Sequence, residues 1–412
     1  MGIVISLAGI VCLLAIAFAC STNRSAINWR TVGGALAIQA SLGAFVLYVP
    51  FGQLVLATIS GGVQAVIDSA QAGISFMFGG LTSDTMYELF GGGGFVFALR
   101  ALPIIVFFSS LIAVLYYLGI MQWVIRVIGG GLQKVLKTSR PESMSATANI
   151  FIGQAEAPLV VKPFIPTMTQ SELFAIMVGG LASVAGTVLG GYASLGVELK
   201  YLIAASFMAA PGGLLMAKIM MPETEKPVDS MALTETATKE HVNVIDAAAS
   251  GASSGLKLAL NVGAMLMAFI ALIALINTLF GFVGGYFGMP DLTMELILGY
   301  LFAPLAFLIG VPWDEAFMAG SFIGQKLIVN EFVAYIDFIG VKEQLSEQSQ
   351  AIITFALCGF ANLSSIAILI GGLGAMAPSR RHDIARLGMR AVLAGSLSNL
   401  MSAALAGLFL AL

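Results

Sequence analysis

Long apolar runs that contain few charges constrain the fold of this chain more than any other feature. Crossing a bilayer as an α-helix takes about 20 apolar residues, and eight runs approach or exceed that length. Only 10% of the residues are charged and 58% are hydrophobic, whereas soluble domains carry about 25% charged residues. The sequence therefore predicts an all-α, polytopic membrane protein. Its predicted spans are residues 3–20, 33–58, 95–120, 173–196, 200–217, 256–284, 350–373 and 391–411.

The first run, 3–20, has a second interpretation as a signal peptide with Cys20 as a lipid-attachment site. Residues 1–10 contain no Lys or Arg, so the positive region that begins such a peptide is missing. We therefore interpret the run as a span.

Several functional classes are excluded by composition. The net charge is −3 without a basic stripe, which argues against a nucleic-acid partner. The three cysteines lie in apolar runs without CxxC spacing, and both histidines lie in polar loops. This set cannot build a disulfide framework, a zinc site or a Cys–His dyad.

Basic residues gather in four loops, which by the positive-inside rule face the cytoplasm. With this orientation both termini face outward. The third loop reads as a flexible cytoplasmic linker at 221–250 that divides the chain into halves. The loops contain Arg24 and Arg30; Arg126, Lys134, Lys137 and Arg140; Lys218, Lys226 and Lys239; and Arg380, Arg381, Arg386 and Arg390.

The two halves resemble each other. Phe-Ile-Gly-Gln at 151–154 recurs at 322–325, and a small and polar stretch at 180–186 aligns with 359–365. Order and spacing are kept in both matches, which predicts an internal repeat. The first copy begins by entering the cell and the second by leaving it. Inverted repeats of this kind are found in many secondary transporters, whose sites form near the midplane from broken helices.

Two segments within the repeats, 143–165 and 314–338, are too interrupted by Gly, Pro and acidic residues to be clean spans. Non-helical backbone at membrane depth is tolerated only where protein buries it or where it lines a wet cavity. We predict two re-entrant hairpins. The run at 292–311 corresponds to the polar segment 121–137, so it is predicted to lie along the interface or to pack on the bundle.

Two glutamates, Glu156 and Glu331, follow the repeated tetrapeptides and are flanked by apolar residues. Ionisable groups at membrane depth cost at least about 2.5–3.5 kcal/mol, so two at related positions favour a shared site. Neutral amides and hydroxyls nearby could recognise an uncharged polar solute, and freed carbonyls with a neutral oxygen could bind sodium. A single Ser or Thr is more often bonded to its own helix. The neutral groups are Asn149, Gln154, Ser183, Thr187, Asn330, Asn362, Ser364 and Ser365.

Three segments that contain these residues resemble the signature segments of the concentrative nucleoside transporters, most closely those of the bacterial sodium-coupled members. They are Gly-Gln-Ala-Glu-Ala-Pro at 153–158, Asn-Glu-Phe-Val-Ala-Tyr at 330–335 and Gly-Phe-Ala-Asn-Leu-Ser-Ser-Ile at 359–366. The similarity extends over nearly the whole chain.

The resemblance implies eight transmembrane helices, two re-entrant hairpins and a homotrimer in the bacterial inner membrane. A transport domain would slide against a scaffold domain like an elevator. The implied division is 1–120 mainly scaffold, with an interfacial segment at about 62–90; 121–220 transport domain with hairpin 1; 221–250 linker; 251–290 scaffold; and 291–412 transport domain with hairpin 2.

The resemblance also implies residue roles. Gln154, Glu156 and Val188 would contact the nucleobase. The ribose hydroxyls would be held by Glu331, Asn362 and Ser365, with Phe360 packed beside the ligand. Co-transported sodium would be bound by the side chains of Asn149 and Ser183 and by the backbone carbonyls of Ile152 and Val184.

One position departs from the family pattern. Ala155 stands where many members have Thr or Ser, so a hydroxyl contact to the base is absent and the base preference is left open. Asn149 is retained, whereas proton-coupled members tend to lack this amide, which favours sodium.

We therefore predict a sodium-coupled symporter that imports uridine-like nucleosides across the bilayer without an organic cofactor. The alternatives are a proton-coupled nucleoside symporter and a passive channel for small polar solutes. An enzyme is not expected, because the sequence shows no metal cluster, nucleophile–base pair or cofactor motif.

Overall fold

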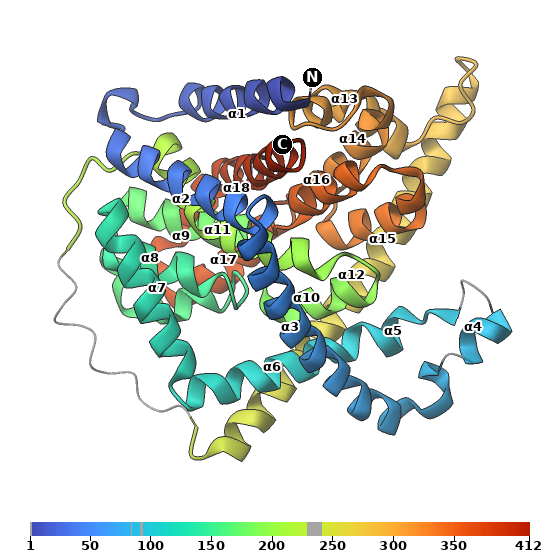
Figure 1. Ribbon diagram of the computed structural model, residues 1–412, viewed down its shortest axis with the longest axis horizontal. Helices are drawn as coiled ribbons and strands as arrows, with labels where there is room; N and C mark the ends of the chain where they lie inside the picture. The colour runs from blue at the N-terminus through green and yellow to red at the C-terminus, as the bar shows by residue number, and fades with distance from the viewer. Residues whose placement is uncertain (1, 84, 91–93, 229–240) are drawn as a thin grey trace.

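The computed structural model describes residues 2–83, 85–90, 94–228 and 241–412 (Figure 1). All the regular secondary structure in these residues is helical, and none of them forms a β-strand. The two ends of the chain meet, because a Cβ atom on Gly2 would lie 3.8 Å from that of Ala411. The predicted all-α class is confirmed.

The first part of the chain contains one helix break that hydropathy did not reveal. The predicted span 33–58 is wrong, because α2 ends at Leu47 and a new helix starts at Pro50. Proline fits the first turn of a helix but disfavours helical conformation in the residue before it. The helices here are α1 (Gly2–Ala19), α2 (Trp29–Leu47), α3 (Pro50–Phe78), α4 (Thr85–Phe90), α5 (Phe97–Arg100), α6 (Leu102–Tyr117) and α7 (Ile120–Leu136).

The predicted interfacial segment 62–90 is occupied by the second half of α3, the 3₁₀ turn η2 (Gly79–Thr82) and α4. Residue 84 lies outside the described part, as do residues 229–240 of the predicted linker. A further 3₁₀ turn, η1 (Arg24–Ala26), joins α1 to α2.

The first repeat begins where two capping boxes define helix starts. In each box the Ser or Thr side chain accepts a hydrogen bond from the backbone N–H of the glutamate three residues later. The glutamate side chain in turn accepts one from the backbone N–H of the Ser or Thr, so two donors that a helix start leaves unpaired are satisfied. Ser139 and Glu142 start α8, and Thr169 and Glu172 start α9. The elements are α8 (Arg140–Ala148), η4 (Ala157–Thr167), α9 (Gln170–Ala182), α10 (Gly186–Ser194) and α11 (Leu199–Met220).

The second half has a similar order of elements. The chain bends by 116° between α13 and α14, and the predicted span 350–373 is divided into α16 and α17, as α9 and α10 divide the earlier one. The elements are α12 (Val244–Gly285), α13 (Met294–Leu308), α14 (Trp313–Ile328), α15 (Glu331–Val341), η6 (Lys342–Gln344), α16 (Glu347–Leu357), α17 (Ser365–Met376), η7 (Pro378–Arg380) and α18 (Arg381–Leu410).

Eight helical stretches in the described part are long and apolar enough to cross a membrane, so the chain is a multi-pass membrane protein. Nearly all residues of α9 and most residues of α11 and α18 are buried, and these helices pack on one another near the centre of Figure 1. By contrast, α3 and α12 turn most of their side chains outward. Helix α12 packs closely on α6, because a Cβ atom at Gly255 would stand only 2.7 Å from Ser109 Cβ.

Candidate transport site

The two broken helices meet at their breaks. The first break separates α9 from α10, and the second separates α16 from α17. The backbone N–H of Phe360 in the second break donates to the carbonyl of Ser183 in the first (3.1 Å). Residues 177 positions apart in the sequence therefore share one site.

Each break is also joined to the interrupted segment of its own repeat. Gly186 N at the first break donates to the carbonyl of Phe151 (3.0 Å), and Leu363 N at the second donates to the carbonyl of Leu327 (3.1 Å). Main-chain groups that the helices leave unpaired thus find partners across the site, as buried backbone groups must.

Glu331 is the most enclosed acidic group of the site. It is the first residue of α15, whose N-terminus Asn330 caps by accepting from Val333 N (2.9 Å). One carboxylate oxygen accepts from the Tyr192 hydroxyl (2.9 Å) and the other from Asn362 Nδ2 (3.2 Å). The positive end of the helix dipole favours a carboxylate there. Glu331 therefore joins α15 to α10 and to the second break.

Asn362 continues this chain of contacts. Its Oδ1 accepts from Ser365 N (2.9 Å) and from the Ser364 hydroxyl (2.7 Å). The Ser365 hydroxyl in turn accepts from Gln154 Nε2 (3.3 Å). Gln154 Oε1 is buried without a partner among the described residues, so it remains available to a donor on a ligand.

The other residues that are predicted to contact the ligand differ in how deeply they are buried. Val188 is buried on α10 and Phe360 is half-buried. Glu156 is also half-buried, and its Oε2 accepts from Gly153 N at 3.4 Å. The two glutamates thus differ: the Glu331 carboxylate accepts hydrogen bonds from two side chains, whereas the Glu156 carboxylate accepts one from a backbone N–H.

Asn149, at the end of α8, has an unsatisfied oxygen. Its Nδ2 donates to Ser145 O (2.9 Å), while its Oδ1 is buried and has no partner among the described residues. The side chain lies against α9, because a Cβ atom at Gly179 would stand 3.3 Å from Asn149 Nδ2. A buried acceptor that lacks a donor is costly, and a cation would satisfy it.

Ser183 lies one turn beyond Gly179 on the same helix. Its hydroxyl donates to Gly179 O (2.9 Å), so the hydrogen goes to its own helix and the oxygen lone pairs remain. In the described residues the carbonyls of Ile152 and Val184 accept no hydrogen bond. These oxygens are neutral, and no group of three or more His, Cys, Asp or Glu that could hold a metal occurs in the described part.

Comparisons with known proteins agree with this geometry. A family model described as "Na+ dependent nucleoside transporter C-terminus" matches residues 201–407, its N-terminal counterpart matches 8–81, and a model described as "Nucleoside recognition" matches 98–198. The nucleoside permease NupC of Helicobacter pylori is 54% identical over 99% of this chain and 98% of its own. This chain belongs to the concentrative nucleoside transporter family.

Further relatives include a mammalian transporter and proteins of known structure. Sodium/nucleoside cotransporter 1 of Mus musculus is 38% identical over 98% of this chain and 63% of its own. CNTnw in an inward-facing substrate-bound state is 62% identical, with a TM-score of 0.96 over 99% of this chain and 98% of that one. Variants of CNTnw have been solved in outward-facing and intermediate states. The family is therefore one of nucleoside transporters, not enzymes, and its solved states support alternating access.

Three residues of this transporter's site region escaped the sequence reasoning: Tyr192, Lys326 and Asn399. Tyr192 is fully buried, with its ring centroid 4.6 Å from that of Phe332 and 4.8 Å from that of Tyr335. Lys326 Nζ donates to Asn399 Oδ1 (2.6 Å). The signal for Lys326 was a charge inside an apolar stretch, the same signal that marked Glu331.

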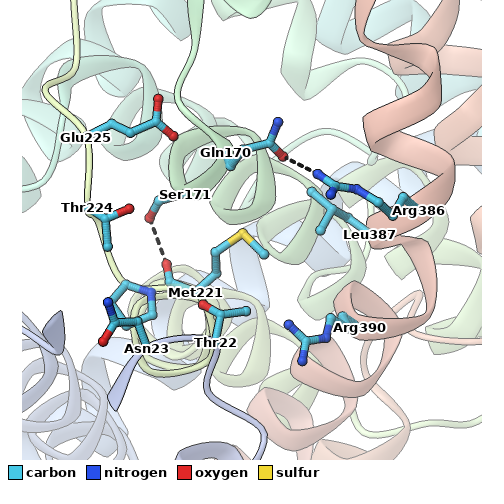
Figure 2. A pocket seen from close by; sticks show the side chains of 11 residues that line it. Thr22, Asn23, Gln170, Ser171, Met221, Thr224, Glu225, Arg386, Leu387 and Arg390 are labelled. Atoms are coloured by element: carbon cyan, nitrogen blue, oxygen red, sulfur yellow. Dashed lines mark hydrogen bonds between the residues drawn. The ribbon is translucent and has the colours of Figure 1, made fainter. Parts of the chain in front are cut away.

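A separate cavity of about 500 Å³ lies where α9 begins and α11 ends, beside α18 (Figure 2). Ser171 donates to the carbonyl of Met221 (2.7 Å) there, and Arg386 donates to Gln170 Oε1 (3.2 Å). None of the predicted ligand or sodium residues lines this cavity, so it is distinct from the candidate transport site.

Proposed function

We propose that this transporter is a sodium-coupled symporter that imports uridine-like nucleosides by an elevator-type movement. The observation that carries the proposal is the meeting of both breaks, where Glu331, Asn362, Ser365 and Gln154 form one chain of hydrogen bonds. Uncharged nucleosides offer hydroxyl and base groups that match such neutral amides, hydroxyls and one carboxylate.

In this proposal the two sides of the site recognise different parts of the ligand. Glu331, Asn362 and Ser365 bind the ribose hydroxyls, and Phe360 packs beside the sugar. Gln154 and Glu156 bind the base, with Val188 against its face. The Tyr192 and Asn362 donors now on Glu331 hold the carboxylate in place until ribose hydroxyls reach it.

Sodium is assigned to the neighbouring oxygens of Asn149, Ser183, Ile152 and Val184. The unpartnered Asn149 Oδ1 and the two free carbonyls are the hard oxygen donors that such a cation prefers. Bound sodium would fix the end of α8 against the first break. Because that break is bonded to Phe360, ordering it completes the nucleoside site.

The remaining assignments follow the family resemblance. The interrupted segments 143–165 and 314–338 act as re-entrant hairpins. They belong to the transport domain, which comprises 121–220 and 291–412, and they move with it. Three copies assemble in a bacterial inner membrane with the termini outside. Sodium bound together with nucleoside drives the loaded domain inward.

A vesicle experiment tests the proposal. Purified protein reconstituted into liposomes should accumulate radiolabelled uridine above the external concentration when an inward sodium gradient is applied. Replacing sodium by choline should abolish accumulation. Uptake that follows a proton gradient without sodium would favour proton coupling instead, and equilibration without accumulation would indicate a passive channel. Recovery of chemically unchanged uridine checks that no reaction occurs.

Gln154 provides a test of the base contact. Gln154→Ala removes the free Oε1 and the bond to Ser365, and one or two neutral hydrogen bonds contribute about 0.5–1.5 kcal/mol each. We expect uridine affinity to fall about 2- to 140-fold while free ribose competes as in the wild type. Equal losses for uridine and ribose in competition binding would place Gln154 on the sugar side.

A further inference from the structure

Asn399 lies on α18 directly behind both breaks. Its Nδ2 donates to the carbonyl of Ala182 (2.6 Å) and to the carbonyl of Cys358 (2.9 Å). Ala182 ends α9 and Cys358 follows α16. The amide thus joins the C-terminal ends of the two half-helices, whose carbonyls have no partner within their own helix.

Lys326 fixes the other side of this amide. Its Nζ donates to Asn399 Oδ1 (2.6 Å) and to the carbonyl of Ala356 (3.1 Å), and the side chain is 2% exposed. A cationic group at the C-terminal end of a helix is favoured by the helix dipole. Because Lys326 occupies the only oxygen of the Asn399 amide, the two Nδ2 hydrogens must face the two breaks.

The residues around the Asn399 side chain are closely packed. A Cβ atom at Gly359 would stand 2.2 Å from Asn399 Oδ1. One turn earlier on α18, a Cβ atom at Gly395 would stand 2.9 Å from Leu181 Cβ and 3.1 Å from Ala361 Cβ. Helix α18 therefore touches both breaks through the same face, and a shift of one break is transmitted to the amide that holds the other.

The residues next to these carbonyls are those of the two proposed sites. Ala182 precedes Ser183 and Val184 of the sodium site, and Cys358 lies two residues before Phe360 of the nucleoside site. We propose that Asn399, oriented by Lys326, couples sodium binding at the first break to ribose binding at the second. This inference rests on the proposed function and assigns a positioning role to two residues that touch neither ligand.

Binding affinities measured in both orders test the coupling. The ratio of the uridine affinities measured with and without saturating sodium is the coupling factor. By thermodynamic linkage, saturating uridine must raise the sodium affinity by the same factor. Such factors are typically about 5–150. We expect Asn399→Asp, which keeps the size and the oxygen facing Lys326 but loses both donors, to bring the factor close to one. Lys326→Met should lower it at least about threefold.

The matched control is Ser396→Ala on the same helix, because in the described part of the chain the Ser396 hydroxyl bonds only to Val392 O of its own helix (2.8 Å). It should keep the wild-type factor. Asn399→Ala provides a second donor-free variant in case Asn399→Asp does not fold.

A structural role alone would weaken both affinities and leave their mutual enhancement unchanged, and that result would overturn the inference. A wild-type factor of one would contradict sodium coupling itself and so remove the proposed function along with the inference.

Discussion

Replacing Glu331 by glutamine is expected to weaken uridine binding at least about 100-fold. Glutamine keeps the shape of the side chain but loses the charge, and each hydrogen bond to a charged group contributes about 1.5–3 kcal/mol. Two ribose hydroxyls bound by the carboxylate would therefore account for about 3–6 kcal/mol, and each 1.4 kcal/mol is a factor of about ten in affinity. Equilibrium binding of labelled uridine to purified protein measures the change.

Glu343→Gln serves as the control, because this glutamate is exposed in the turn η6 and should bind uridine as the wild type does. Sodium affinity in the absence of uridine should survive in Glu331→Gln. Near-normal uridine binding by Glu331→Gln would remove this residue from the ribose site.

Replacing Asn149 by alanine is expected to abolish sodium stimulation of uptake. The substitution deletes the buried Oδ1 that has no protein partner, and with it one of four proposed sodium ligands. Uridine uptake into vesicles at saturating sodium should fall at least about tenfold, to the level measured in choline. Varying the sodium concentration distinguishes weakened sodium binding from a slower transport step.

Thr147→Ala is the matched control on α8, because among the residues that the structure describes the Thr147 hydroxyl donates only to Ser143 O of its own helix (2.8 Å). It should retain wild-type sodium dependence. If Asn149→Ala kept full sodium stimulation, the sodium site would have to lie elsewhere in the chain.

Hydropathy predicted the helical class and most of the spans, because it depends only on residues that are neighbours in the sequence. The breaks at 183–185 and 358–364 follow from small and polar residues inside apolar runs. The boundary at Pro50 was missed, since apolar residues continue on both sides and only the proline marks it. The hairpins and their glutamates were predicted from the residues, whereas the role of each residue came from the family resemblance. The structure links Gln154, Ser365, Asn362 and Glu331 by hydrogen bonds.

Tyr192 and Asn399 could not be assigned from sequence, because their partners lie on other helices. Lys326 was visible as a charge inside an apolar stretch, but its partners on other helices were not. Tyr192 reaches Glu331 across 139 positions, and Asn399 reaches Ala182 across 217. A lone Tyr or Asn in an apolar run has many local explanations. Only the packing of α18 against both breaks shows why an amide stands there.

The length of α12 has a mechanical consequence. Its 42 residues extend about 63 Å at 1.5 Å per residue, whereas a bilayer with its headgroups is about 40–45 Å thick. An upright helix of this length would protrude, so α12 must cross obliquely or reach out of the membrane. Because α12 packs on α6 and α6 packs on α10, the thickness of the surrounding lipid is connected through two helices to α10, which carries the proposed base contact Val188.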